Sequence, residues 1–308
     1  MIDIIIPAYN AHSTIGNTLG SIAKQINRDC LQVYIVNDGS ERDYSNFIND
    51  FSGILDIQEI TIKNSGPGKA RQVGIDSSNN EYIVFVDADD VLYNEYSLVN
   101  LLSIISEADL AEGHFIETHQ DGSSRELSPQ YCYLHGKMYR RSIIEKNKLK
   151  FNSPKQKDGD LYEDSAFNQL YNVCCDNIVS TEEVIYVYQY NENSLTKKEV
   201  NVARNLKYFV DEMTWLAKEI DKRKLDNSFR IAWNIYIVCF HIYYNHLLSK
   251  DESGFVFNDK NMILLKDMYQ RYADCLDWDN QLYLFKIFNN YDVIPYISFY
   301  DFMDKIGA

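Results

Sequence analysis

The amino-acid sequence predicts an α/β fold in which a mostly parallel sheet is flanked by helices and followed by an α-helical C-terminal region. Apolar runs of strand length alternate with segments of helical spacing over residues 2–86, and polar residues follow each run. From about Val200 onward the spacing is helical. We therefore expect two parts, residues 1–198 and residues 199–308. The 308 residues, 45% of them hydrophobic, are enough for one large domain and a smaller appendage.

The first part alternates regularly. Its expected strands are Ile2–Pro7, Leu31–Val36, Ile57–Ile62 and Glu81–Val86. The expected helices are His12–Lys24, Asp43–Phe51 and one that begins at Lys69 after the Gly66-Pro67-Gly68 turn. In such sheets, ligands bind at the carboxyl ends of the strands. Polar residues follow all four strand ends, at Tyr9-Asn10, Asp38, Asn64 and Asp87-Ala88-Asp89, which predicts a binding crevice at one edge.

The pattern becomes less regular after residue 94. Expected helices are Ser97–Glu107, Ser142–Lys148 and Leu161–Val173, and expected strands are Leu110–Glu117, Tyr131–Leu134 and Val184–Tyr190. Gln120–Ser128 and Ser153–Asp160 are expected to be loops.

The strand that ends at Val86 delivers three carboxylates within four residues, in the run Asp87-Ala88-Asp89-Asp90. Because isolated carboxylates are costly to bury, such a run indicates a ligand. Two aspartates one residue apart suit Mg²⁺ or Mn²⁺, with substrate phosphates filling the other positions. The alternative is an acidic turn that caps the following helix. In both interpretations Asp90 is expected to be a cap of that helix.

Composition excludes several classes of protein. The formal net charge of −15 disfavours a nucleic acid partner and makes an anionic lipid surface unfavourable. The six cysteines form no CxxC pair, no signal-peptide pattern opens the chain, and Ile231–Leu248 is too polar for a membrane span. We expect a cytoplasmic protein without a transmembrane segment. Peripheral contact at the inner membrane face would require a local basic or apolar patch on the helical region.

Six segments carry a family resemblance. They are Ile4-Ile5-Ile6-Pro7-Ala8-Tyr9-Asn10, Val36-Asn37-Asp38-Gly39-Ser40, Asn64-Ser65-Gly66-Pro67-Gly68-Lys69-Ala70-Arg71, Phe85-Val86-Asp87-Ala88-Asp89-Asp90, Gly136-Lys137-Met138-Tyr139-Arg140-Arg141 and Tyr162-Glu163-Asp164-Ser165-Ala166-Phe167. Their order and spacing resemble the GT-A glycosyltransferases of family 2, inverting enzymes that use nucleotide-sugar donors. The resemblance runs from residue 2 to about residue 195 and implies a Rossmann-like sheet.

The resemblance also implies a donor site. Its expected residues are Pro7, Ala8 and Tyr9 against the nucleoside, Asp38 on the uracil N3–H, Gly68 and Arg71 beside the donor, and Asp87, Ala88 and Asp89 at the ribose and diphosphate. Asp89 is the expected metal ligand, for Mn²⁺ or Mg²⁺. Gln189 and Asn191 stand where family members often carry Arg or His, so phosphate contact there would have to come from Lys197 or Lys198.

Catalysis by inversion needs a base on the face opposite the leaving group. By resemblance Asp164 is that base, and Glu163 and Lys137 bind the acceptor or support the site. The alternative for Glu163-Asp164 is an acidic pair that stabilises a helix N-terminus.

The sequence thus predicts metal-dependent transfer of a sugar from a nucleoside diphosphate sugar to a hydroxyl of a glycan or lipid-linked glycan. A uridine nucleotide in the donor would fit Asp38. The alternative is a non-catalytic nucleotide-sugar-binding or scaffold protein of a polysaccharide assembly system. A Rossmann dehydrogenase is disfavoured because no GxGxxG follows the first strand. The chain could form a homo-oligomer, or contact a partner, through its C-terminal helices.

Overall fold

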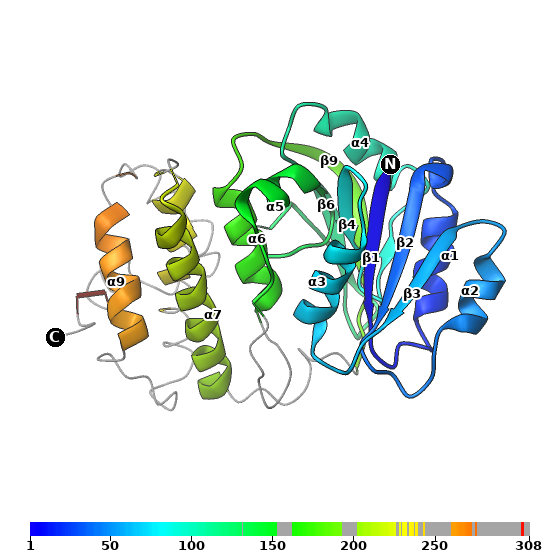
Figure 1. Cartoon of the computed structure of the whole chain (residues 1–308), viewed down its shortest axis with the longest axis horizontal. Coiled ribbons are helices and arrows are strands. Elements are labelled where there is room, and N and C mark those ends of the chain that lie inside the picture. Colours follow the sequence, from blue (N-terminus) through cyan, green and yellow to red (C-terminus); the bar gives the residue numbers. More distant parts are fainter. Residues whose placement is uncertain are drawn as a thin grey trace. The chain divides into compact units, whose positions relative to one another are not determined.

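The computed structural model divides into two compact units, one of residues 1–171 and 175–198, the other of residues 172–174 and 199–308 (Figure 1). The structure describes residues 1–130, 132–152, 162–192, 202–225, 228, 230–232, 234–236, 238–239, 243, 260–272, 275 and 303–304. The expected loop Ser153–Asp160 and the lysines Lys197 and Lys198 lie outside the described residues.

The first unit is built on one mixed sheet with strand order β3-β2-β1-β4-β8-β6-β9-β5 (Figure 1). Its strands are β1 (Ile2–Ala8), β2 (Leu31–Asn37), β3 (Asp56–Thr61), β4 (Tyr82–Phe85), β5 (Val91–Leu92), β6 (Leu110–Thr118), β7 (Ser124–Leu127), β8 (Lys137–Arg140) and β9 (Ile178–Tyr188). Strands β1 to β4 pair in parallel, whereas β8 runs antiparallel to both β4 and β6. The α/β prediction is confirmed, and β6 and β9 form a further parallel pair outside the N-terminal strands.

Helices cover both faces of this sheet. They are α1 (Ile15–Ala23), α2 (Ser45–Phe51), α3 (Pro67–Ser77), α4 (Ser97–Ile105), α5 (Arg141–Asn147) and α6 (Glu163–Val173). Ile4 and Ile6 of β1 share a core cluster with α1 and α4. Ile5 points to the other face, because side chains alternate along a strand. There it lies so close to α3 that a Cβ on Gly74 would be 2.3 Å from Ile5 Cγ2.

Aromatic packing closes the second face. The ring of Phe85 on β4 meets Phe151 and Phe167 edge-on, and Phe151 stacks on Phe167 with 4.0 Å between ring centroids. Phe167 belongs to α6, so this cluster fixes the helix that carries Glu163 and Asp164 against the sheet.

Three differences from the expected elements have physical reasons. Gln120–Ser128 is not only a loop, because β7 returns along β6 after the Asp121-Gly122 turn. No strand forms at residues 132–134, and Tyr131 lies outside the described residues. The strand in this part of the chain is β8, at Lys137–Arg140. The two-residue strand β5 is too short to produce a periodic signal.

The described part of the second unit is helical. Helix α7 (Val202–Arg223) buries Met213, Leu216 and Ile220, and helix α9 (Lys260–Tyr272) buries Leu265 and Met268. Apolar residues three and four apart give each helix one apolar face. Among the described residues, no helix is both long and apolar enough to cross a membrane.

Candidate active site

Parallel pairing brings the predicted donor residues to one edge of the sheet. Strands β1, β2 and β4 are neighbours and end at Ala8, Asn37 and Phe85. Tyr9 and Asp38 follow two of these ends directly, and Asp87 follows the third after Val86, so the three segments meet where the sequence predicts a crevice. A backbone bond of 2.9 Å from Asp38 N to Ala8 O ties two of these ends together.

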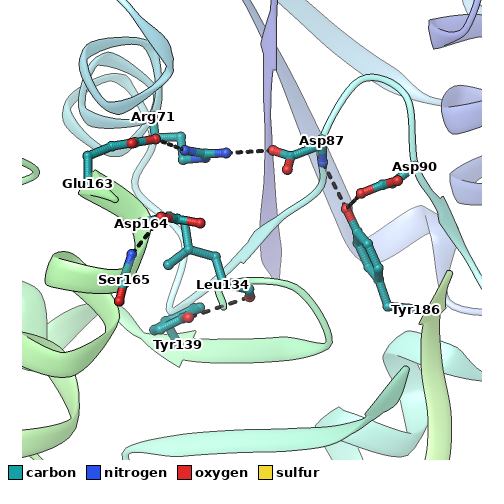
Figure 2. A network of polar contacts seen from close by, with 9 residues as sticks. All are labelled: Arg71, Asp87, Asp90, Leu134, Tyr139, Glu163, Asp164, Ser165 and Tyr186. Carbon is teal, nitrogen blue, oxygen red and sulfur yellow. Dashed lines mark hydrogen bonds and ion pairs between the residues drawn. The ribbon is translucent and has the colours of Figure 1, made fainter. Parts of the chain in front are cut away.

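Arg71 of α3 holds two carboxylates from distant parts of the chain (Figure 2). Its Nη2 lies 2.7 Å from Asp87 Oδ1, and its Nη1 lies 2.8 Å from Glu163 Oε1. The Arg71 side chain is only 7% exposed. Burial alone would lower the pKa of Arg71, but the charges of Asp87 and Glu163 raise it, so the guanidinium stays protonated. Arg71 therefore joins the loop after β4 to the start of α6.

Asp164 lies beside this ion pair at the first turn of α6 (Figure 2). Its Oδ1 accepts a hydrogen bond of 2.7 Å from the backbone N–H of Ser165. Burial raises the pKa of Asp164, and the positive charge of Arg71 partly opposes that shift. A carboxylate with a raised pKa accepts a proton more readily, which is what a general base requires.

The carboxylate loop, residues 87–90, is held by the end of strand β9. The hydroxyl of Tyr186 accepts a bond of 3.0 Å from Asp87 N and donates one of 2.9 Å to Asp90 Oδ2 (Figure 2). Asp90 Oδ1 accepts from Gln189 N at 2.7 Å. The prediction that Asp90 caps the next helix is wrong, because its carboxylate is buried and fixes the loop, and the residue before α4 is Tyr96.

Asp89 lies between the fixed residues of this loop. Asn191 Nδ2 donates to Asp89 Oδ2 at 2.8 Å. Burial raises the pKa of Asp89, and the neighbouring charge of Asp87 raises it further. A nearby cation would relieve both effects by favouring the ionised carboxylate.

The arrangement suits a divalent cation that is shared with a bound phosphate group. No group of three or more His, Cys, Asp or Glu side chains in the described ranges is arranged to hold a metal alone. Magnesium is usually held by one or two carboxylates together with substrate phosphates. The partly exposed carboxylates of Asp87 and Asp89 match that arrangement.

Asp38 has a structural role in addition to any contact with a base. Its Oδ1 accepts from Ser65 N at 2.8 Å and its Oδ2 accepts from Gly66 N at 2.9 Å. These bonds fix the segment that leads into α3. The next residue, Gly39, has φ 74°, and a Cβ there would be 2.7 Å from Asn64 N, so the turn requires glycine.

Two other predicted residues have protein partners. A Cβ on Gly68 would be 2.7 Å from Glu163 Cγ, so glycine here allows α3 to approach α6. Lys137 is 1% exposed, and its Nζ binds Glu112 Oε2 at 2.9 Å. This ion pair supports the sheet, and the structure gives no contact between Lys137 and Asp164.

Sequence reasoning missed Tyr186 and did not assign Asn191 a partner. Tyr186 stands in an apolar run of β9, where Ile185 is equally buried, so only the fold shows that its hydroxyl lies between Asp87 and Asp90. Asn191 is noticeable in the sequence because it replaces an expected basic residue. In the structure its amide binds the carboxylate of Asp89.

Solved structures of similar fold carry nucleotide sugars. Residues 1–349 of Staphylococcus aureus TarS, in complex with UDP-GlcNAc, match 99% of this chain and 89% of that chain with a TM-score of 0.69 and 18% identity. Mannosyltransferase PcManGT from Pyrobaculum calidifontis, in complex with GDP-Man and Mn²⁺, matches with a TM-score of 0.54 and 15% identity. At such identities the likeness establishes the fold alone, and it confirms the GT-A expectation.

Sequence relatives are consistent with this fold. The chain is 26% identical over 222 residues to EpsJ of Bacillus subtilis, an uncharacterized glycosyltransferase, covering 64% of this chain and 63% of EpsJ. It is 23% identical over 236 residues to the glycosyltransferase GlyA of Streptococcus pneumoniae, covering 31% of GlyA. The chain thus spans less than two thirds of the length of these relatives.

The family model for glycosyl transferase family 2 matches residues 3–160, just over half of the chain. The matched region contains the strand ends, Arg71 and the carboxylate loop. Glu163 and Asp164 follow directly after it. With this match, the chain belongs to glycosyltransferase family 2.

Proposed function

We propose that this protein transfers a sugar from a nucleoside diphosphate sugar to a hydroxyl group, with inversion at the anomeric carbon. The observation that carries the proposal is the Arg71 ion pair, which places the carboxylate loop after β4 and the Glu163-Asp164 pair on one site. Donor-binding and base-bearing segments that lie far apart in the sequence are thereby held together. Membership of family 2 supports the same activity.

The donor is a uridine diphosphate sugar under this proposal. Pro7, Ala8 and Tyr9 close β1 and would form one wall for the nucleoside. Asp38 lies at the end of the neighbouring strand, where a carboxylate could accept the uracil N3–H. TarS, a protein of similar fold, binds UDP and UDP-GlcNAc in its crystal structures, which supports the choice of nucleotide.

A divalent cation held by Asp89 would neutralise charge on the departing diphosphate. Asp87, bound by Arg71, would be left to contact the ribose or metal-bound water. Mn²⁺ and Mg²⁺ both prefer oxygen ligands of this kind.

Asp164 is the proposed base. It removes the proton from the acceptor hydroxyl as the oxygen attacks the anomeric carbon and the bond from that carbon to the diphosphate oxygen breaks. Glu163 is bound to Arg71 at 2.8 Å, so we assign it a positioning role. Because the attack and the departure are on opposite faces, the configuration inverts.

The acceptor is proposed to be a glycan or lipid-linked glycan. Relatives include a poly(ribitol-phosphate) beta-glucosyltransferase of Bacillus spizizenii, 25% identical over 168 residues. That protein's name specifies a polymer, poly(ribitol-phosphate), which supports a polymeric acceptor with free hydroxyl groups. A cytoplasmic location and assembly through the C-terminal helices belong to the same proposal.

The first test is a thermal-shift panel with UDP, GDP, CDP and dTDP sugars, each with and without Mn²⁺. A ligand that binds only the folded state stabilises it by about 2.7 kcal/mol when present at a hundredfold its Kd. We expect a metal-dependent shift with the UDP sugar. Release of UDP in the presence of acceptor fractions then tests turnover.

Asp89→Asn should remove the metal-dependent part of this shift, since an amide is a poorer ligand for a hard cation. Asp50→Asn, an identical change at an exposed position on α2, is the matched control and should keep the full shift. A shift that is equally large in Asp89→Asn contradicts the metal assignment. Nucleotide binding without turnover of any acceptor would favour the scaffold alternative.

A further inference from the structure

Four rings form a stack beside the candidate active site, which we call the aromatic column: Tyr133, His135, Tyr186 and Tyr188. The imidazole of His135 is the centre. Its ring centroid lies 4.8 Å from Tyr133, 4.9 Å from Tyr186 and 5.7 Å from Tyr188, and all three interplanar angles are 22° or less. Phe115 of β6 packs edge-on against His135 and Tyr133. The stacked rings of the column are therefore also held from the side by Phe115.

The inner end of the column is part of the site. Tyr186 is 1% exposed, and its hydroxyl is bound to Asp87 and Asp90 of the carboxylate loop (Figure 2). Any side chain stacked on this tyrosine is therefore held at a fixed position relative to that loop.

The outer end of the column is open. Tyr133 is 41% exposed, although one of its faces is covered by His135. Most exposed aromatic side chains can change rotamer. The ring of Tyr133 is instead fixed by stacking on His135 and by the edge contact with Phe115. Rigid tyrosines offer a large amphipathic contact surface at little cost in conformational entropy.

The segment that carries Tyr133 also lies within electrostatic reach of the proposed base. Burial raises the pKa of Tyr133, and the charge of Asp164 is among the influences that raise it further. Leu134, the residue between Tyr133 and His135, is drawn together with Asp164 in Figure 2. Its carbonyl accepts from Tyr139 Oη at 3.5 Å. Burial raises the pKa of Cys132, in the same segment, to about 12, and the negative charge of Asp164 is the second largest cause of that rise.

The column itself carries no charge. Burial lowers the pKa of His135 to about 3, so the imidazole is neutral at physiological pH. A neutral stack with an open tyrosine face suits a partner that is itself uncharged, with an apolar ring face and hydroxyl groups at its edge. A pyranose ring has this chemistry.

We propose that the exposed face of Tyr133 is a saccharide-binding surface that stacks on a sugar ring of the acceptor and delivers its hydroxyl toward Asp164. The inference rests on the proposed function and adds a residue that determines acceptor specificity. It concerns neutral sugar rings rather than the nucleotide of the donor, so donor binding should not depend on it.

The test uses the whole 308-residue chain and three neutral probes, methyl β-glucoside, methyl β-galactoside and methyl N-acetyl-β-glucosaminide. Binding of each probe is measured by saturation-transfer NMR. We expect at least one probe to bind the wild-type chain. Tyr133→Ala should raise its dissociation constant by about tenfold, equivalent to ~1.4 kcal/mol and within the range of an aromatic stacking contact. Tyr133→Phe and Tyr133→Trp should retain binding, because both keep the ring face.

Tyr96→Ala is the matched control, since Tyr96 is 49% exposed and lies at the start of α4. It should leave sugar binding unchanged. The UDP–Mn²⁺ thermal shift is measured on every variant and should be the same in Tyr133→Ala as in the wild type. Unchanged sugar binding in Tyr133→Ala, or no binding of any probe to the wild type, would overturn the proposal. Loss of the nucleotide shift in the wild type would instead count against the proposed function.

Discussion

At the scale of single residues, the site consists of carboxylates that the protein pairs in different ways. Asp87 and Glu163 share Arg71, and Asp90 is held by Tyr186. Asp164 accepts a hydrogen bond from the backbone N–H of Ser165 (Figure 2). It lies near Arg71 but does not form a direct ion pair with it. The paired carboxylates are fixed in place, whereas Asp164 is the carboxylate that we propose as the base.

Asp164→Asn should keep donor binding and lower transfer by about 10²–10⁴-fold, the usual contribution of a general base. In the wild type, transfer should fall as the pH falls through the pKa of Asp164, which burial raises above its usual value. Steady-state rates across pH, beside the thermal shift with UDP, measure both effects. Equal loss of donor binding and transfer would show that Asp164 is structural.

The raised pKa of Asp164 also affects the stability of the folded state. Because the folded state binds this proton more tightly than the unfolded state, the contribution of Asp164 to stability is present at low pH and is lost as pH rises through its folded pKa. Asp164→Asn should therefore be more stable than the wild type at neutral pH, and the difference should narrow on acidification.

The sequence allows individual candidate residues to be proposed, but it does not predict their partners. Asp87, Asp89 and Asp164 follow from motif positions. The contact from Arg71 to Glu163 joins residues 92 positions apart, and the contact from Tyr186 to Asp90 joins residues 96 apart. Local patterns carry no information about such pairs, because they depend on how the helices pack on the sheet.

At the scale of elements, the strands buried on both faces were the most predictable. β1, β2 and β4 are continuous apolar runs, and their expected bounds agree with the structure to within one residue. β8 was misplaced because it contains Lys137 and Arg140, whose charges are compensated by Glu112 and Glu81 from other segments. Charged residues argue against a buried strand until their partners are known.

The packing of α3 on β1 allows a direct test. Gly74→Ala would place a Cβ 2.3 Å from Ile5 Cγ2 and should destabilise the protein by about 1–3 kcal/mol, the cost of overpacking a core. Gly20→Ala on α1 meets no atom within 4 Å and should stabilise by up to about 1 kcal/mol through helix propensity. Urea unfolding of both variants measures the difference. Equal stabilities would show that α3 moves away from the sheet at little cost.

At the scale of the whole molecule, the formal charge of −15 opposes the approach of an anionic donor. The fold places a few cations where they are needed, notably Arg71, but most of the field is repulsive. Electrostatic repulsion at long range is screened over about 10 Å at 0.1 M salt and about 30 Å at 0.01 M.

We therefore expect the association rate of a fluorescent uridine diphosphate analogue to increase when NaCl is raised from about 10 mM to about 150 mM, since added salt screens the repulsion. Stopped-flow mixing measures this rate. An uncharged uridine analogue should show no such dependence. A rate that falls with added salt would indicate that the local positive charge at the site outweighs the net charge of the molecule.

The shared ion pair of Arg71 also limits how the sequence can change over time. Replacing Asp87 or Glu163 alone would leave the buried guanidinium with half of its compensating charge, and replacing Arg71 would leave two carboxylates facing each other. Each single replacement is costly for stability, whereas a coordinated replacement of all three leaves no buried charge uncompensated. Among homologous sequences, we expect these three positions to covary, retained or exchanged together even where the neighbouring loops diverge.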